Sequence, residues 1–293
     1  MDDHRTEFFN DLQFGGVGPA SPSALVADGL LHRHRIEGDK PGSLNGWHVL
    51  HLDSPASGAA GNWRTGARLT WCGKRLQSLT ASERALLSQR IEQDRKRAQE
   101  AQEARHRDAA AKAARIWADA APASPRHPYL ERKGIAPGIA RQSGASLVLP
   151  VVDFSGALHG LQFIDEQGGK RFISGMAKQG HFIPTGKAPD GTRTLYIAEG
   201  WATAATIQAM RPNVCTIAAC DAGNLPSVAT AARRTWGGVP IVIAPDFDKV
   251  GQEKGREACT QVGGHWLPTP ADLPTSCTDW NDWRQFQRQG VAS

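Results

Sequence analysis

Three groups of carboxylates in the C-terminal half of the sequence have spacings that could serve a divalent metal ion. Glu199 follows the apolar run LYIA, and Asp246 and Asp248 follow the apolar run IVIA and a proline. Asp279 and Asp282 form a later pair in the segment TDWNDW. Apposed carboxylates with little cationic compensation are what hard cations such as Mg²⁺ select. An isolated Asp-x-Asp motif is more often an acidic surface turn, so the interpretation depends on whether these groups converge.

The elements around these carboxylates predict that they do converge. The segments TLYIAEGWATAATIQAM, NVCTIAAC and VPIVIAPDFD each contain a short apolar strand, and helical stretches separate the strands. Alternating strands and helices indicate a parallel sheet. In such a sheet the site gathers at the carboxyl ends of the strands, where Glu199, Asp246 and Asp248 all lie. Because side chains alternate along a strand, we expect Asp246 and Asp248 to point to the same face.

The N-terminal part of the chain has a different character. Residues 1–75 are rich in Gly, His and Trp with short alternating runs, which predicts a small β-rich module. Residues 76–120 predict one long charged helix, in which Thr80 and Glu83 fit a capping box. Few apolar residues interrupt its charges, so we expect a solvated helix that acts as a linker.

The C-terminal part is predicted to contain two further segments. Residues 121–190 include the runs SLVLPVVDFSG and ALHGLQFIDEQGGKRFISG, which indicate antiparallel strands joined by glycine-containing turns. Residues 191–293 hold the predicted parallel sheet and all of the carboxylates described above. We therefore expect the chemistry of the chain in this last segment.

The order of the carboxylate motifs resembles a toprim domain, the catalytic fold shared by bacterial primases, topoisomerases and some nucleases. The preceding runs HPYLERKGI, LVLPVVDFSGALHGLQFI and GGKRFISG are similar to the region before toprim in bacterial-type DNA primases, especially those of plasmids, phages and other mobile elements. The resemblance covers about residues 115–285. It implies an α/β toprim core, a small mostly parallel sheet flanked by helices, preceded by a primase-type α+β subdomain.

The resemblance also implies roles for individual residues. Glu199, Asp246 and Asp248 match the catalytic, metal-binding carboxylates of toprim, and Asp279 and Asp282 match the later acidic pair of metal ligands. The implied cofactor is Mg²⁺ or Mn²⁺.

The basic residues before the core match a different part of the family pattern. Lys170 and Arg171 match the segment that holds the template strand or nucleotide phosphates, and Lys178 belongs to the same surface. Two departures stand out: the sequence has no cysteine-rich zinc module, and Thr203 occupies a position where cellular primases often have an acid.

The function implied is that of a DNA primase, which makes short primers on single-stranded DNA from nucleoside triphosphates by metal-dependent nucleotidyl transfer. Such an enzyme would serve the replication or transfer of a plasmid, phage or integrative element. The alternatives are a toprim-type metal-dependent nuclease and a non-catalytic nucleic-acid-binding toprim protein. The similarity of the preceding runs to the region before toprim in DNA primases favours the primase. No segment has the spacing of a phosphate-binding loop, so we expect any replicative helicase to be a separate partner.

The N-terminal module is a second candidate for nucleic-acid binding. Aromatic and basic residues alternate in it, a combination that suits single-stranded DNA through stacking and electrostatic attraction. A small β core built on the tryptophans is the competing interpretation. The candidate residues are Arg33, Arg35, Lys40, Trp47 and Trp63.

Bulk composition sets few limits. A hydrophobic content of 40% and a charged content of 22% are ordinary for a globular protein, and the formal net charge of +5 is compatible with a polyanionic partner. No apolar run approaches the roughly 20 residues of a membrane helix, and no secretory signal is visible. The five cysteines form no CxxC pair. We therefore expect a cytoplasmic location without membrane contact.

Overall fold

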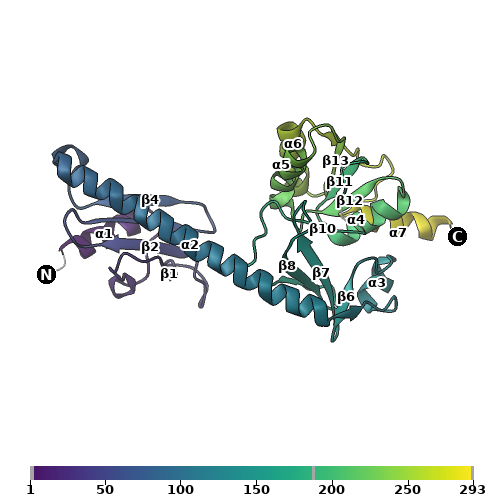
Figure 1. Cartoon of the computed structure of the whole chain (residues 1–293), viewed down its shortest axis with the longest axis horizontal. Helices are drawn as coiled ribbons and strands as arrows, with labels where there is room; N and C mark the ends of the chain where they lie inside the picture. The colour runs from purple at the N-terminus through teal and green to yellow at the C-terminus, as the bar shows by residue number, and fades with distance from the viewer. Residues whose placement is uncertain (1–2, 187–188, 292–293) are drawn as a thin grey trace. The chain divides into compact units, whose positions relative to one another are not determined.

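The computed structural model describes residues 3–186 and 189–291, and the chain forms two compact units. The first unit is Met1–Glu103 and the second is Ala104–Ser293. The boundary lies within one helix, α2 (Ala81–Asp119), which contributes residues to both units (Figure 1).

The first unit is built on a four-stranded antiparallel sheet in which neighbouring strands follow the order of the chain. Its core forms where Phe8 and Leu12 pack against sheet residues that include Leu50 and Trp71. Its elements before α2 are α1 (Asp3–Phe14), a 3-10 turn (Pro22–Ala24), β1 (His32–His34), β2 (Gly46–His51), β3 (Ser57–Asn62), β4 (Arg68–Cys72) and a second 3-10 turn (Leu76–Ser78).

Helix α2 begins with the predicted capping box. The backbone N–H of Thr80 donates to the carboxylate of Glu83 over 2.9 Å, and the N–H of Glu83 donates to Oγ1 of Thr80 over 3.2 Å. The expectation of a solvated linker is wrong for the second half, where Ala109 and Ala113 are buried. Their small side chains let this half of the helix approach Val148 and Leu161 of the sheet that follows it, so a narrow alanine stripe is enough to bury one face.

The second unit begins with a five-stranded antiparallel sheet of order β5-β6-β7-β8-β9. Its central strand is buried on both faces: Val148 packs towards Ala109 and Ala113 of α2, and Leu147 and Leu149 pack towards the second sheet. The elements of this part are β5 (Ala121–Pro122), α3 (Pro128–Lys133), β6 (Arg141–Ser143), β7 (Ser146–Val152), β8 (Leu158–Ile164) and β9 (Lys170–Phe172).

The second sheet has the order β10-β12-β11-β13-β14, and every pair is parallel except β10 with β12. Helices α4 and α7 lie on one side of it, and α5 and α6 lie on the other (Figure 1). This is an α/β fold with a small, mostly parallel sheet. Its elements are β10 (Ile183–Pro184), β11 (Leu195–Ala198), α4 (Trp201–Met210), β12 (Cys215–Ala218), a 3-10 turn (Ala222–Asn224), α5 (Leu225–Thr235), β13 (Ile241–Ala244), α6 (Lys249–Val262), β14 (His265–Trp266) and α7 (Trp280–Val291).

Alternate residues along the strands of this sheet pack against helices on opposite sides. In β11, Leu195 and Ile197 pack with α5 and α6, whereas Tyr196 and Ala198 pack with α4. Both faces are therefore apolar, and only the ends of the strands are free to carry polar groups. None of the helices in residues 3–186 and 189–291 combines the length and apolar character needed to cross a bilayer.

Candidate active site

Glu199 and Asp246 lie side by side at the carboxyl ends of two adjacent strands. β11 and β13 run parallel with Ala198 opposite Ala244, so the residues that follow them emerge at the same place. Oε1 of Glu199 accepts a hydrogen bond of 2.9 Å from the backbone N–H of Asp246. Glu199 is only 7% exposed. The sheet register therefore places a buried carboxylate against the start of the Asp-x-Asp motif.

Gly251 makes this close approach sterically feasible. A Cβ at this position would lie 2.3 Å from Oε1 of Glu199 and 2.9 Å from the backbone oxygen of Asp246, far inside van der Waals contact. The backbone N–H of Gly251 also donates a 2.7 Å hydrogen bond to Oδ1 of Asp248. The first turn of α6 is thus packed directly against the Glu199 carboxylate and the backbone of Asp246.

The expectation that Asp246 and Asp248 point to the same face of a strand is wrong. β13 ends at Ala244, and Pro245 follows, which lacks the N–H that a central strand requires. Asp246 instead turns inward, and its Oδ1 is buried. Asp248 is exposed and acts as the N-cap of α6. The two aspartates are neighbours in different environments, because Asp246 is half-buried and Asp248 is exposed.

Burial and mutual repulsion raise the pKa values of the inner carboxylates. Burial, followed by the charges of Glu199 and Asp279, raises the pKa of Asp246 to about 8. Burial also raises the pKa of Glu199, and the negative charge of Asp248 adds to this effect. A carboxylate with such a pKa has too little positive charge nearby to offset its burial and the repulsion, and a bound cation would supply it.

The two residues of the later acidic pair, Asp279 and Asp282, have different surroundings. The negative charge of Asp279 acts on Asp246, as just described, and its Oδ2 lies 3.9 Å from Nζ of Lys133. Oδ1 of Asp282 lies 3.2 Å from the same Nζ, and its Oδ2 accepts a hydrogen bond of 3.2 Å from the N–H of Thr278. The structure therefore brings Asp279 to the carboxylate cluster and engages Asp282 in the N-terminal turn of α7.

Asp221 is a further carboxylate of the cluster that the sequence analysis missed. It comes shortly after β12, and its negative charge contributes to the raised pKa of Glu199. Its Oδ1 accepts a 3.1 Å hydrogen bond from the N–H of Asn224, and its Oδ2 is paired with Lys178. Its position after an apolar strand, in NVCTIAACDAGN, is the same signal that identified Glu199 and Asp246.

The basic segment of β9 faces in two directions. Nζ of Lys170 lies 3.6 Å from the position that a Cβ on Gly200 would take, and its positive charge acts to lower the pKa of Asp246. Arg171, the next residue of the strand, stacks on Phe163 with its Cζ 5.0 Å from the ring centroid. Strand alternation therefore directs Lys170 towards the carboxylates and Arg171 to the opposite face of the sheet. Phosphate binding by these residues stays a prediction.

The donor set fits a divalent metal ion. Oδ1 of Asp246 is buried, and within the part of the chain that is described it has no hydrogen-bond partner. Its neighbours Glu199, Asp248 and Asp279 supply further carboxylate oxygens, the ligands preferred by hard cations. Metal binding by these four residues stays a prediction.

A comparison with protein families decides what this arrangement is. Residues 194–290 match the family model described as "Toprim domain". This part of the chain is a toprim domain. The match contains the inner carboxylates and the later acidic pair, and it confirms the resemblance seen in the sequence motifs.

Two curated relatives extend the comparison beyond the toprim domain. A DNA primase TraC of Escherichia coli is 34% identical over 94% of this chain, and a second DNA primase TraC of Escherichia coli is 34% identical over 82% of it. These alignments cover 21% and 24% of the relatives, so the chain spans about a fifth to a quarter of their length. The predicted kinship with toprim DNA primases is confirmed.

Solved structures give weaker likenesses. The primase fragment of the bacteriophage T7 primase-helicase protein has a TM-score of 0.43 and 17% identity, covering 56% of this chain and 72% of that one. A T7 lagging-strand DNA polymerase complex with primase domains of two gp4 subunits, bound to an RNA/DNA hybrid and dTTP, has a TM-score of 0.38 and 17% identity. That second match covers 55% of this chain and 80% of the matched chain.

Outside the toprim domain, the first unit contains a groove of about 900 Å³. Trp47 and Trp63 line it, with ring centroids 5.9 Å apart, and Trp63 is 55% exposed. Arg33 is paired across the strands with Trp47, so both side chains lie on the groove face of the sheet. Arg35 and Lys40 are exposed on the segment that follows β1. Of the five residues proposed to bind single-stranded DNA, Trp47 and Trp63 line the groove, and Arg33 lies on the same face of the sheet.

The raised pKa of Asp246 in the toprim domain predicts a pH dependence of stability. This carboxyl loses its proton near pH 3.9 in an unfolded chain but keeps it to about pH 8 in the folded, metal-free protein. The free energy of unfolding should therefore fall as the pH rises between these values and level off above pH 8. Measured by urea unfolding in EDTA, the loss between pH 5.5 and 8.5 should be smaller for Asp246→Asn by at least about 1 kcal/mol. Parallel pH profiles for the two proteins would contradict this assignment.

Gly251→Ala should disrupt the toprim site without unfolding the protein. The new Cβ would displace the Glu199 carboxylate, so we expect Mn²⁺ binding, measured by calorimetry, to weaken at least about tenfold. Gly238→Ala is the matched control because a Cβ there meets no atom of the described residues within 4 Å. Equal Mn²⁺ affinity for both variants would show that the contact between Gly251 and Glu199 is not needed.

Proposed function

We propose that this chain is a DNA primase that synthesises short primers on single-stranded DNA from nucleoside triphosphates. The observation that carries the proposal is the group of buried, poorly compensated carboxylates around Glu199 and Asp246 in the toprim domain. It occurs in a chain related over 94% of its length to a protein named DNA primase. The enzyme would act in the replication or transfer of a plasmid, phage or integrative element.

The proposed cofactor is Mg²⁺ or Mn²⁺, held by Glu199, Asp246, Asp248 and Asp279. When bound, such an ion supplies positive charge that stabilises phosphate oxygens and lowers the pKa of a coordinated hydroxyl. The protein contributes the fixed positions of the ligands. The 2.9 Å hydrogen bond to Glu199 and the N-cap of α6 at Asp248 both restrict the movement of the carboxylates.

Lys170 is the proposed contact for the triphosphate. It is exposed on the edge strand β9, and its ammonium group lies beside Gly200, the residue that follows Glu199. In primer synthesis the 3′-hydroxyl of one nucleotide attacks the α-phosphate of the next, and pyrophosphate leaves. An ammonium group here would neutralise charge on the phosphates while they are aligned for attack. Lys178, paired with Asp221, would extend the same basic edge.

Two features favour primer synthesis over DNA cleavage by the same carboxylates. Lys170 comes from the sheet that precedes toprim, and the TraC relatives align through that sheet as well. A non-catalytic role is disfavoured because the toprim carboxylates Glu199, Asp246 and Asp248 are all present. Nuclease activity or simple nucleic-acid binding without synthesis would contradict the proposed function.

We also propose that the groove of the first unit binds single-stranded DNA, the template. The tilted rings of Trp47 and Trp63 offer a stacking surface, and Arg33 on the same sheet face offers charge to the phosphates. Arg35 and Lys40 would add longer-range attraction that weakens with salt. A helicase, where replication requires one, would be a separate partner.

Primer synthesis is tested by de novo synthesis on circular single-stranded DNA with four ribonucleotides, one of them radiolabelled, and Mg²⁺ or Mn²⁺. The wild type should make short labelled oligomers. Asp246→Asn combined with Asp248→Asn should make at least about 100-fold fewer, because the charge that organises the site is lost. Glu253→Gln, an exposed substitution on the helix that Asp248 caps, should behave as the wild type.

The same assay separates the alternatives. Metal-dependent nicking or degradation of the DNA without labelled product would identify a nuclease. Intact DNA without product would identify a non-catalytic binding protein. Primers made equally well by the double variant would remove the toprim carboxylates from the mechanism.

Template binding is tested with a fluorescent oligothymidine and anisotropy. Trp63→Ala should weaken binding about tenfold, the effect of removing one stacked base contact. Phe14→Ala is the matched control because Phe14 is 98% exposed and does not line the groove. Equal affinities for the two variants would show that the strand does not stack in the groove.

A further inference from the structure

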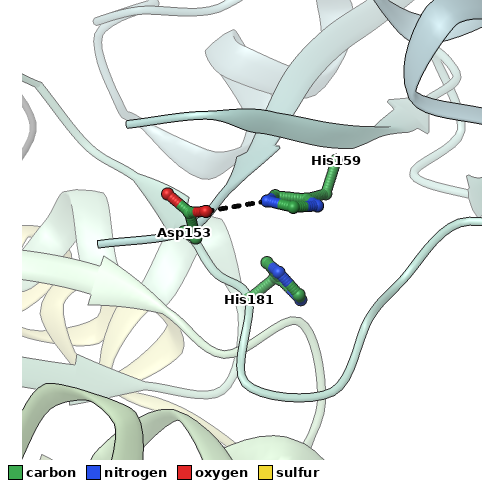
Figure 2. Close-up of side chains that lie close together, drawn as sticks. All are labelled: Asp153, His159 and His181. Carbon is green, nitrogen blue, oxygen red and sulfur yellow. Dashed lines mark hydrogen bonds and ion pairs between the residues drawn. The ribbon is translucent and has the colours of Figure 1, made fainter. Parts of the chain in front are cut away.

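A cluster of one carboxylate and two imidazoles lies outside the toprim carboxylate site. Asp153 follows the end of β7, His159 lies on β8, and His181 belongs to the segment between β9 and β10 (Figure 2). One candidate ligand atom from each residue lies within 4.8 Å of the other two. All three side chains are partly exposed, so solvent ions can reach them.

The geometry within the cluster is close to that of a metal site. Nε2 of His159 lies 2.8 Å from Oδ2 of Asp153, and the rings of His159 and His181 have centroids 4.0 Å apart. An ion with bonds of about 2.1 Å holds its ligand atoms roughly 3 to 4 Å apart, so binding requires shifts of less than about 1 Å. Small rotations about the side-chain torsions supply such shifts.

Asp153 is held in place by the turn that it begins. Its Oδ1 accepts hydrogen bonds from the backbone N–H groups of Ser155 at 2.8 Å and Ala157 at 3.0 Å. These bonds leave Oδ2 directed at His159, as Figure 2 shows. In the metal-free protein one proton lies between Oδ2 and Nε2, and an ion that bound there would take its place.

His181 is also fixed through its backbone. Its N–H donates to the carbonyl of Lys178 over 3.0 Å, and its own carbonyl accepts a 3.0 Å hydrogen bond from Nδ2 of Asn224. Its Nδ1 is buried and has no hydrogen-bond partner within residues 3–186 and 189–291. A buried ring nitrogen without a hydrogen-bond partner is energetically costly, and a metal bond to Nδ1 would remove this cost.

We propose that Asp153, His159 and His181 bind one transition-metal ion, with Zn²⁺ as the expected occupant. Two imidazoles and one carboxylate suit Zn²⁺ better than Mg²⁺, which prefers oxygen ligands and water. The chain would then hold two kinds of metal ion, an oxygen-bound one in the toprim domain and a nitrogen-bound one here. Three protein ligands leave one tetrahedral position for water.

The location gives this ion a stabilising function. Its ligands join the β7–β8 hairpin to the segment that carries Lys178, and Lys178 pairs with Asp221 of the toprim domain. Asn224 of the toprim domain also donates to the carbonyls of Lys178 and His181. The ion would therefore fix this segment against both the hairpin and the toprim domain.

The experiment uses the full chain with Asp246→Asn and Asp248→Asn, which removes ligands of the toprim site. Co²⁺, a spectroscopic substitute for Zn²⁺, is titrated into the metal-free protein. One equivalent should bind and give visible ligand-field bands, and Zn²⁺ should displace it. Zn²⁺ at a hundredfold excess over its Kd should raise the melting temperature by about 5 °C or more relative to EDTA.

Ligand variants in the same background assign the site. His159→Gln and His181→Gln should each lose the Co²⁺ bands and the melting shift, whereas His265→Ala, which removes an exposed imidazole from β14, should keep both. Melting in EDTA shows whether each variant is folded. Absence of Co²⁺ bands in the parent protein would overturn the proposal without recourse to any variant. Bands that persist in both glutamine variants would overturn it as well.

Discussion

The toprim domain of this chain depends on keeping two carboxylates buried next to each other. Glu199 and Asp246 follow strands that are neighbours in a parallel sheet, and the hydrogen bond from the backbone of Asp246 to Glu199 joins the two strand ends. Burying negative charge in this way is unfavourable, and the raised pKa of Asp246 expresses that cost. The protein tolerates it because the rest of the sheet is apolar on both faces and tightly packed.

Several contacts hold the elements around Glu199 and Asp246 in place. Gly251 allows the first turn of α6 to approach, and Asp248 caps that helix. On the far side, Asn281 of α7 is buried and donates to the carbonyl of Lys133 and to Oγ1 of Thr206. These hydrogen bonds tie α7 to α3 and α4. They thereby position Asp279, which directly precedes α7. The acidic cluster is thus assembled from strand ends and helix starts.

The antiparallel sheet before toprim has two functions within the second unit. One face of β7 packs on α2, and the other packs on the toprim core. Its edge strand β9 then presents Lys170 to the carboxylates and Arg171 to the other side. This sheet is therefore a structural partner of the toprim domain, and the alignment with the TraC relatives extends over both parts.

The sequence by itself determined the type of fold and most of the carboxylate cluster. Apolar four-residue strands that end in acids are a local pattern, and a parallel sheet must bring such ends together, so Glu199 and Asp246 could be paired without coordinates. The capping box at Thr80 and Glu83 is equally local. Asp221 carried the same signal and could have been found.

Tertiary structure alone decided the features that depend on where a strand stops or what packs on a helix. Ending β13 at Ala244 separated Asp246 from Asp248, and Lys133, distant in sequence, engaged Asp282. The alanine stripe of α2 became a buried face only because a sheet lies against it. Asp153 and His181 are 28 positions apart in the sequence and meet because Val152 and Phe182 form a β-bridge. Such contacts arise from packing between distant segments, which no local pattern encodes.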